Sequence, residues 1–78
     1  MSNLQTIISS PPDRENVVFE IWSGSQQVAE ISREPGQDYN IEIYPAPDDG
    51  VWRFDLIDLK NAIEDGIKEL SGNLRGID

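Results

Sequence analysis

The chain has 78 residues, and fifteen Asp and Glu against six Lys and Arg give it a formal charge of −9 and a pI near 4.1. It has no cysteine and no histidine, which excludes disulfides, thiolate nucleophiles, zinc-thiolate sites and the usual proton shuttle. A chain this short forms one modest core and leaves little room for a catalytic cleft. Its acidity repels nucleic acid and anionic membrane and attracts basic partners, or else serves solubility alone.

No apolar run of the sequence approaches the roughly 18 residues that a membrane span requires. Residues 1–10 also lack the basic start of a signal peptide. We therefore expect a cytoplasmic protein of one domain, residues 1–78, that is not an enzyme and has no catalytic residue, metal or cofactor.

Residues 1–16 combine a short apolar patch with a proline-rich breaker. Leu4, Ile7 and Ile8 precede Pro11 and Pro12, which favour an extended segment without ladder donors. This segment is either a frayed tail or an edge segment laid against a sheet. Three large apolar residues favour partial order.

Residues 17–54 predict an antiparallel sheet. Three runs rich in β-branched and aromatic residues cover residues 17–23, 27–34 and 39–44, with turns at residues 24–26 and at Pro35-Gly36. Pro45 and Pro47 then end the meander because proline removes ladder donors. Residues 51–54 form either a short fourth strand or an extended approach to a helix, with Trp52 and Phe54 pointing inwards.

Alternation along the three runs divides this sheet into two faces of different chemistry. The apolar face is the expected core: Phe19, Ile21, Ala29, Ile31, Ile41 and Ile43. The outer face carries acidic and aromatic side chains: Glu20, Trp22, Val28, Glu30, Glu42 and Tyr44. If the core residues share a face, a three-residue first loop sets the strand register, with Phe19, Ile31 and Ile41 abreast and Ile21, Ala29 and Ile43 abreast. The same register brings Glu20, Glu30 and Glu42 into one row.

The C-terminal part predicts one helix over residues 55–72, followed by a tail at residues 73–78. Asp55 is a suitable N-cap with Asp58 three residues later, and an apolar stripe recurs at spacings of three and four: Leu56, Leu59, Ile63, Ile67 and Leu70. Gly66 costs about 1 kcal/mol relative to alanine inside a helix, which indicates close approach to the sheet. We expect an α+β fold, a three- to four-stranded antiparallel β-meander with this helix packed on its apolar face.

The three glutamates in one row are the most specific feature of the sequence. Like charges on adjacent strands cost up to about 1 kcal/mol per pair unless a cation relieves them. The row is either a solvated polar face, relieved by Arg33 or by lysines, or a contact surface for a basic protein. Trp22 and Tyr44 favour the second interpretation because large aromatics anchor interfaces, unless the N-terminal segment covers them. The predicted partner-binding residues are Glu20, Trp22, Glu30, Glu42 and Tyr44.

Other chemistry finds weaker support in the sequence. A carboxylate pair for glycoside hydrolysis needs a cleft that a flat sheet does not offer. Asp48-Asp49-Gly50 lacks the ligand spacing of an EF-hand loop and is typical of a simple turn. The acidic charge and the lack of a basic patch argue against nucleic-acid binding.

Four stretches of the chain carry a resemblance to a known class of protein: Ser10-Pro11-Pro12-Asp13-Arg14-Glu15, Val28-Ala29-Glu30-Ile31-Ser32 with Glu34, Ile41-Glu42-Ile43-Tyr44-Pro45, and residues 52–59. Across roughly residues 9–70 the chain resembles small acidic bacterial immunity proteins of contact-dependent inhibition and Rhs toxin systems. The resemblance implies a cytoplasmic inhibitor that binds a cognate toxin, often a nuclease with a basic active site. It assigns no binding residue, because immunity families use different surfaces.

The sequence thus predicts a binding protein, and three hypotheses stay open. The first is an immunity protein whose glutamates match Lys and Arg of a nuclease toxin, with Trp22 and Tyr44 as anchors. The second is a nucleic-acid mimic of the anti-restriction or anti-CRISPR type, which needs acids spread over a long surface. The third is a structural or regulatory module whose sheet face forms a homodimer. Either the open sheet face or the helix face makes the contact.

Overall fold

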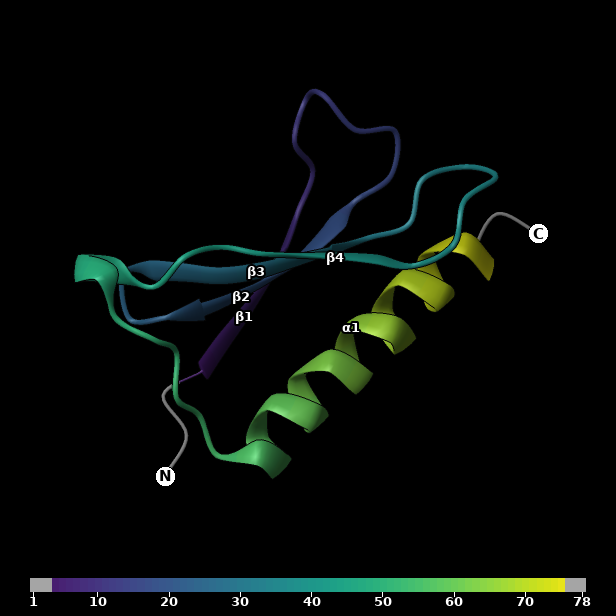
Figure 1. The fold of residues 1–78 in the computed structure, drawn as a ribbon. Helices are drawn as coiled ribbons and strands as arrows, with labels where there is room; N and C mark the ends of the chain where they lie inside the picture. Colours follow the sequence, from purple (N-terminus) through teal and green to yellow (C-terminus); the bar gives the residue numbers. More distant parts are fainter. Residues whose placement is uncertain (1–3, 76–78) are drawn as a thin grey trace.

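The chain folds as a four-stranded antiparallel sheet with one C-terminal helix packed against it, an α+β fold as predicted (Figure 1). The computed structural model describes the backbone of residues 4–75 and the side chains of residues 4–71. Its elements are β1 (Leu4–Ser9), β2 (Val18–Ser23), β3 (Gln26–Ser32), β4 (Asn40–Ile43), a 3-10 turn (Pro47–Asp49) and α1 (Leu56–Arg75). The strands lie in chain order, so β1 and β4 are the two edges of the described sheet.

The N-terminal apolar patch forms the edge strand β1. It pairs antiparallel with β2, and Ile8 lies opposite Phe19. Of the two alternatives for this segment, the structure therefore has the edge strand. Residues 51–54 are not a strand but an extended approach to α1, and the side chains of Trp52 and Phe54 pack against the core as predicted.

The predicted register holds across the middle of the sheet. Two rows of directly opposed residues cross β2, β3 and β4 as expected: Phe19, Ile31 and Ile41 in one, and Ile21, Ala29 and Ile43 in the other. The first turn differs, because it has two central residues, Gly24 and Ser25, and the register of the strands beside it shifts at a β-bulge between Ile21 and Trp22. Gly24 has a φ of 61°, which glycine adopts at no steric cost.

The bulge changes the position of one side chain. Val28 is the extra residue, since Trp22 pairs with Gln27 while Ile21 pairs with Ala29. A bulge re-aims side chains locally, and Val28 is buried in the core cluster. The prediction that Val28 lies on the outer face is therefore wrong.

Helix α1 begins at its predicted cap and lies close to the sheet. The backbone N–H of Asp58 donates to Asp55 Oδ2 at 3.1 Å, so Asp55 is the N-cap. A Cβ on Gly66 would lie 2.7 Å from Cδ2 of Phe19 and 2.9 Å from Cδ1 of Ile31, which explains the glycine. The helix continues to Arg75, beyond the predicted end at residue 72. The rest of the expected tail, residues 76–78, lies outside the described residues.

The helix covers only part of the sheet. It packs against β1, β2 and β3, crossing below the strands at an angle (Figure 1). A helix is about 10–12 Å across with its side chains, whereas four strands spaced about 4.8 Å apart make a wider layer. Ile41 and Ile43 on β4 are consequently 41% and 68% exposed, and the prediction that both belong to the core is wrong.

The buried face of α1 also differs from the predicted stripe. Ala62, Gly66 and Leu70 are buried, whereas Leu56 and Ile67 are exposed. The core cluster is therefore small: Phe19, Ile21, Val28, Ala29, Ile31, Ala62 and Leu70. Within the part of the chain that the structure describes, α1 is not apolar enough to cross a membrane.

Candidate functional site

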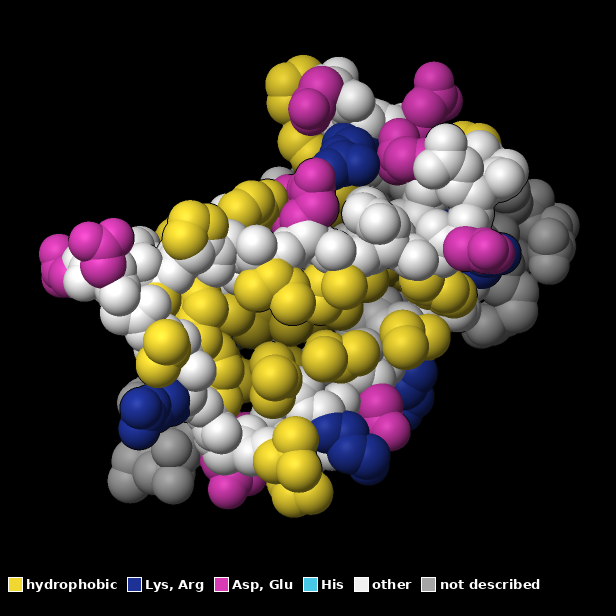
Figure 2. All heavy atoms as spheres, in the orientation of Figure 1, with side chains coloured by type: hydrophobic (Ala, Val, Ile, Leu, Met, Phe, Trp, Pro, Cys, Tyr) yellow, Lys and Arg dark blue, Asp and Glu magenta, His cyan; other side chains and the backbone are white. Residues whose placement is uncertain are grey.

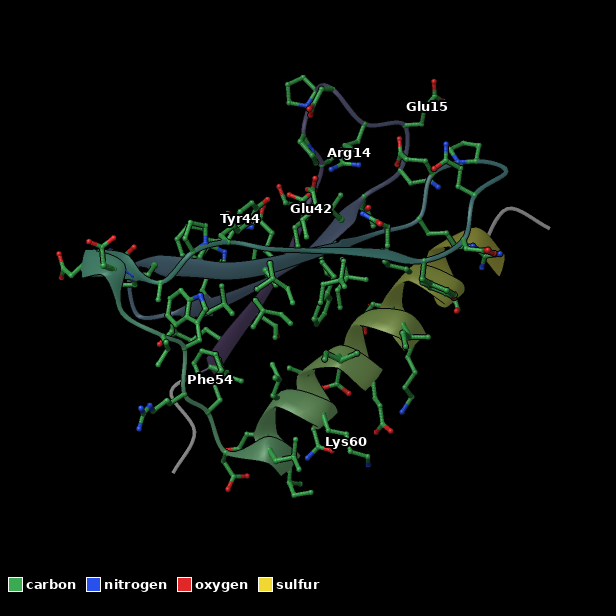
Figure 3. All side chains as sticks on the ribbon, in the orientation of Figure 1. Arg14, Glu15, Glu42, Tyr44, Phe54 and Lys60 are labelled. Atoms are coloured by element: carbon green, nitrogen blue, oxygen red, sulfur yellow. The ribbon has the colours of Figure 1, made fainter. Side chains whose placement is uncertain are left out.

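Glu20, Glu30 and Glu42 form a row across β2, β3 and β4, here called the glutamate row. Glu20 lies directly opposite Glu30, and Glu30 directly opposite Glu42. Directly opposed residues share a face, with Cβ atoms about 4.5–5.5 Å apart. Glu42 projects from the face opposite α1 (Figure 3). The structure thus brings the three predicted carboxylates together on the outer face.

Arg14, a cation that the sequence had not singled out, lies over the glutamate row. It comes from the β1–β2 loop, which rises on the outer face of the sheet (Figures 1 and 3). Its Nη2 donates to Glu30 Oε2 at 2.7 Å and to Glu42 Oε1 at 3.3 Å. The side chains of Arg14 and Glu30 are 24% and 13% exposed, whereas that of Glu42 is 52% exposed. Glu30 is therefore shielded, and Glu42 keeps an accessible carboxylate.

Arg33, the cation expected to relieve the row, is engaged elsewhere. Its side chain donates to the Gln37 carbonyl and to the Tyr39 hydroxyl, both at 3.3 Å. Its guanidinium carbon also lies 4.7 Å from the centre of the Tyr39 ring. In the alternative that Arg33 or lysines relieve the row, Arg33 thus does not pair with the row among the described contacts. Arg14, a loop residue distant in sequence, pairs with the glutamate row instead.

The loop that carries Arg14 is tied to the end of β3. The backbone N–H groups of Glu15 and Asn16 donate to the Glu34 carboxylate at 2.9 and 3.3 Å. The Asn16 side chain donates to the Arg33 carbonyl at 2.5 Å. These bonds fix the short path from the loop back to the sheet. Arg14 is thereby positioned by the fold.

Trp22 lies beside the row on the same face. Its Nε1 donates to Glu20 Oε1 at 2.9 Å, so one carboxylate of the row accepts a bond from an aromatic neighbour. The side chain is half-buried between its cross-strand partners Gln5 and Gln27. Trp22 therefore presents part of its ring to solvent, with its polar atom already satisfied.

Tyr44 follows β4 and lies on the same side of the sheet as Glu42 (Figure 3), where its phenol interacts with the carboxylates of the glutamate row. Burial raises the pKa of its phenol above the usual 10.0, the carboxylates of the row raise it further, and Arg14 acts in the opposite direction. The backbone N–H of Tyr44 donates to the Val28 carbonyl at 2.9 Å. The phenol is thus kept neutral next to acids and can donate a hydrogen bond to an incoming acceptor.

The glutamate row has the chemistry of a cation-binding surface. The guanidinium of Arg14 pairs with two of the three carboxylates, and the formal charge of these four side chains is −3 + 1 = −2. Among the described side chains, no group of three acids is placed to share a metal ion. Carboxylates of this kind pair with guanidinium and ammonium groups, as Glu30 and Glu42 do with Arg14.

A second surface opens between β4 and α1, here called the β4 groove. It is a cavity of about 470 Å³, whose lining includes Ile41, Ile43, Trp52, Phe54, Leu56 and Ile63. Figure 2 shows hydrophobic side chains gathered between the strands and the helix with a narrow hollow among them, while charged side chains lie above the sheet and along the lower border of the molecule. Sequence reasoning missed this groove because it placed Ile41 and Ile43 in a closed core.

One wall of the β4 groove is aromatic. The rings of Trp52 and Phe54 stack with centroids 5.5 Å apart. Trp52 Nε1 donates to the Tyr44 carbonyl at 2.7 Å, which ties this wall to the end of β4. This wall of the groove is therefore held by ring stacking and by one hydrogen bond to the backbone.

No protein-family model, curated protein or solved structure shows significant similarity to this chain. The resemblance to immunity proteins accordingly stays a prediction. The two surfaces themselves are the basis for inferring a function.

Proposed function

We propose that this protein is a cytoplasmic immunity protein, which neutralises a cognate toxin, a nuclease in the first instance, by covering its basic surface. The observation that carries the proposal is the glutamate row, three carboxylates abreast on an open sheet face. Arg14 offsets part of the repulsion within this row in the free protein, and cations of a partner relieve the rest on binding.

The distribution of charge supports a protein partner. The whole chain carries −9, which accelerates encounter with a basic protein. The carboxylates of the row are concentrated at one place on the sheet, whereas a nucleic-acid mimic needs acids spaced along a phosphate-like path. A compact acidic surface suits the Lys and Arg of a nuclease active site.

The local geometry suggests how the partner is held. Glu42 is the accessible end of the row and accepts the first cation, while Glu30 stays paired with Arg14. Trp22 and Tyr44 offer half-buried rings beside it, which an interface desolvates further. Binding then combines charge pairing with aromatic contact.

The test is binding to the toxin domain encoded by the neighbouring reading frame. The triple variant Glu20→Gln, Glu30→Gln and Glu42→Gln keeps the fold, because amide oxygens still accept from Arg14 and Trp22. We expect affinity to fall at least about tenfold and protection of growth to be lost.

The matched control removes the same number of charges from α1 through Glu64→Gln, Asp65→Asn and Glu69→Gln. It should bind nearly as well as the wild type, because these side chains are exposed on the helix. Equal affinity of the row variant and the wild type would sink the proposal. Equal losses in both triple variants would show that only net charge matters.

A further inference from the structure

β4 is an edge strand, and its edge that faces away from β3 is open for pairing with another strand. The backbone N–H of Tyr44 donates to β3, and donors alternate in direction along a strand. The N–H and C=O groups of Ile41 and Ile43 therefore point away from β3, toward the edge. Such an edge is a template for one more strand.

The two faces beside this edge have opposite chemistry. On the inner face, Ile41 and Ile43 border the β4 groove, an apolar hollow next to the open edge. On the outer face, Glu42 carries the exposed carboxylate of the glutamate row. A strand laid along β4 would thus meet apolar surface on one side and negative charge on the other.

We propose that β4 accepts an extended segment of the protein partner as an additional antiparallel strand. The segment alternates apolar side chains, which enter the β4 groove, with Lys or Arg side chains, which lie beside Glu42. Backbone bonds to Ile41 and Ile43 supply affinity, and the alternation supplies specificity. The inference rests on the proposed function only for the basic character of the partner.

The β1 edge is less suited to the same partner. The hollow beside β1 is lined by Thr6, Ile7, Ile8 and Phe19 and also by two acids of α1, Asp65 and Glu69, whereas none of the described acids lines the β4 groove. Apolar side chains of a strand added there would enter a hollow that contains two carboxylates. Only β4 combines an apolar groove with an acidic outer face among the described strands.

Charge argues for a basic partner over a second copy of this chain. Two copies would bring together two chains of −9 each. Antiparallel pairing of Ile41 with Ile43 of the other copy would also place the two Glu42 residues directly opposite each other, which is destabilising. With a Lys-bearing strand of a basic protein, the two molecules attract each other, and the side chain opposite Glu42 carries the opposite charge.

The probe is the peptide acetyl-Lys-Val-Lys-Ile-Lys-Val-Lys-amide, titrated calorimetrically into the full chain. Ile43→Thr keeps a β-branched side chain but removes apolar surface, and we expect it to weaken binding about tenfold. Ile7→Thr is the control, because Ile7 is an exposed isoleucine on the other edge strand. A peptide with the same residues in two blocks, Lys and then apolar, should bind weakly.

Backbone methylation of the peptide tests strand pairing directly. In an antiparallel pair, the residue opposite Ile43 exchanges both backbone bonds with it and shares its face. N-methylation at the apolar positions should therefore abolish binding, whereas N-methylation at the Lys positions should be tolerated. Equal binding of both methylated peptides, or the reverse preference, would overturn the proposal.

The outcomes separate this inference from the proposed function. If the Glu-to-Gln row variant loses the toxin while Ile43→Thr and methylation have no effect, the strand-docking inference fails and the proposed function stands. If the peptide docks as described but the row variant keeps the toxin, the proposed role of the row fails alone. Concentration-dependent dimerisation that Ile43→Thr abolishes, measured by sedimentation without peptide, would make the edge a self-interface and overturn the docking.

Discussion

Gly66 of α1 lies directly against the ring of Phe19 in β2. A Cβ at this position would come within 2.7 Å of Phe19 Cδ2, closer than side-chain atoms pack. The glycine thus sets how near the helix axis approaches the sheet. Glycine lowers the helix propensity at this position but allows the close approach.

Gly66→Ala should destabilise the protein despite better helix propensity. Alanine gains about 1 kcal/mol in an exposed helix, but forcing a methyl group into a packed core costs about 1–3 kcal/mol. Urea denaturation should give a net loss. Ile31→Val removes the Cδ1 that would lie 2.9 Å from the alanine methyl group, so the double variant should lose less than the sum of the single variants. Stabilisation by Gly66→Ala would contradict the close approach.

Arg14→Ala should lower the free energy of unfolding by about 1 kcal/mol, because it leaves the shielded Glu30 without its cation. The loss should shrink in high salt and in a Glu30→Gln background, where the charge needs no partner. Lys60→Ala is the comparison, since Lys60 pairs with Glu64 at 3.4 Å with both side chains more than half exposed. That exposed pair should contribute about 0.3–0.5 kcal/mol. Equal losses for both variants would show that the Arg14 contact has no special value.

Asp55→Ala should cost about 1 kcal/mol, because the N–H of Asp58 loses its acceptor at the start of α1. Asp55→Asn keeps an acceptor oxygen and should cost only a fraction of that. Asp38→Ala, in an exposed loop, controls for removal of one negative charge. Thermal melts of the three variants provide the comparison. A similar melting temperature for Asp55→Ala and Asp38→Ala would contradict the cap.

The two tyrosines of the chain should ionise in opposite directions from the usual value of 10.0. The Ser71 hydroxyl and then Arg33 lower the pKa of Tyr39 by bonding to its hydroxyl, whereas burial and the glutamate row raise the pKa of Tyr44. Phenolate absorbance of Tyr39→Phe should therefore titrate above pH 10.0, and that of Tyr44→Phe below it.

The stability consequence of Tyr44 follows from the sign of its shift. Its pKa is higher in the folded state, so its contribution is complete below pH 10.0 and is lost as pH rises through the folded pKa. Tyr44→Phe should therefore reduce the loss of stability at strongly alkaline pH. An unchanged alkaline profile in this variant would contradict the field of the row at Tyr44.

Local patterns predicted several features of this protein. The alternation of apolar residues along the strands predicted the register that places Phe19 opposite Ile31. The same register predicted the row of three glutamates. The capping pattern located the start of α1 at Asp55, and the isolated Gly66 indicated close packing. These features depend on residues that are close in the sequence or on regular alternation along a strand. Both can be read from the sequence directly.

The candidate site needed contacts that no local pattern contains. Arg14 and Glu42 are far apart in the chain, and only the path of the β1–β2 loop brings them together. The two-residue turn and its bulge buried Val28, although alternation had placed it outside. Loops and bulges change register locally, so a uniform period misplaces the residues beside them.

By itself the sequence determined the acidic charge, the alternating faces of the sheet, the amphipathic helix and the row of Glu20, Glu30 and Glu42. The tertiary structure decided that β1 is one edge strand of the sheet and that Arg14 covers part of the glutamate row. It also decided that one helix, narrower than four strands, leaves Ile41 and Ile43 exposed beside a groove. Periodicity specifies which side of a strand is apolar, but how much of that side is covered depends on the number, width and direction of the elements packed on it.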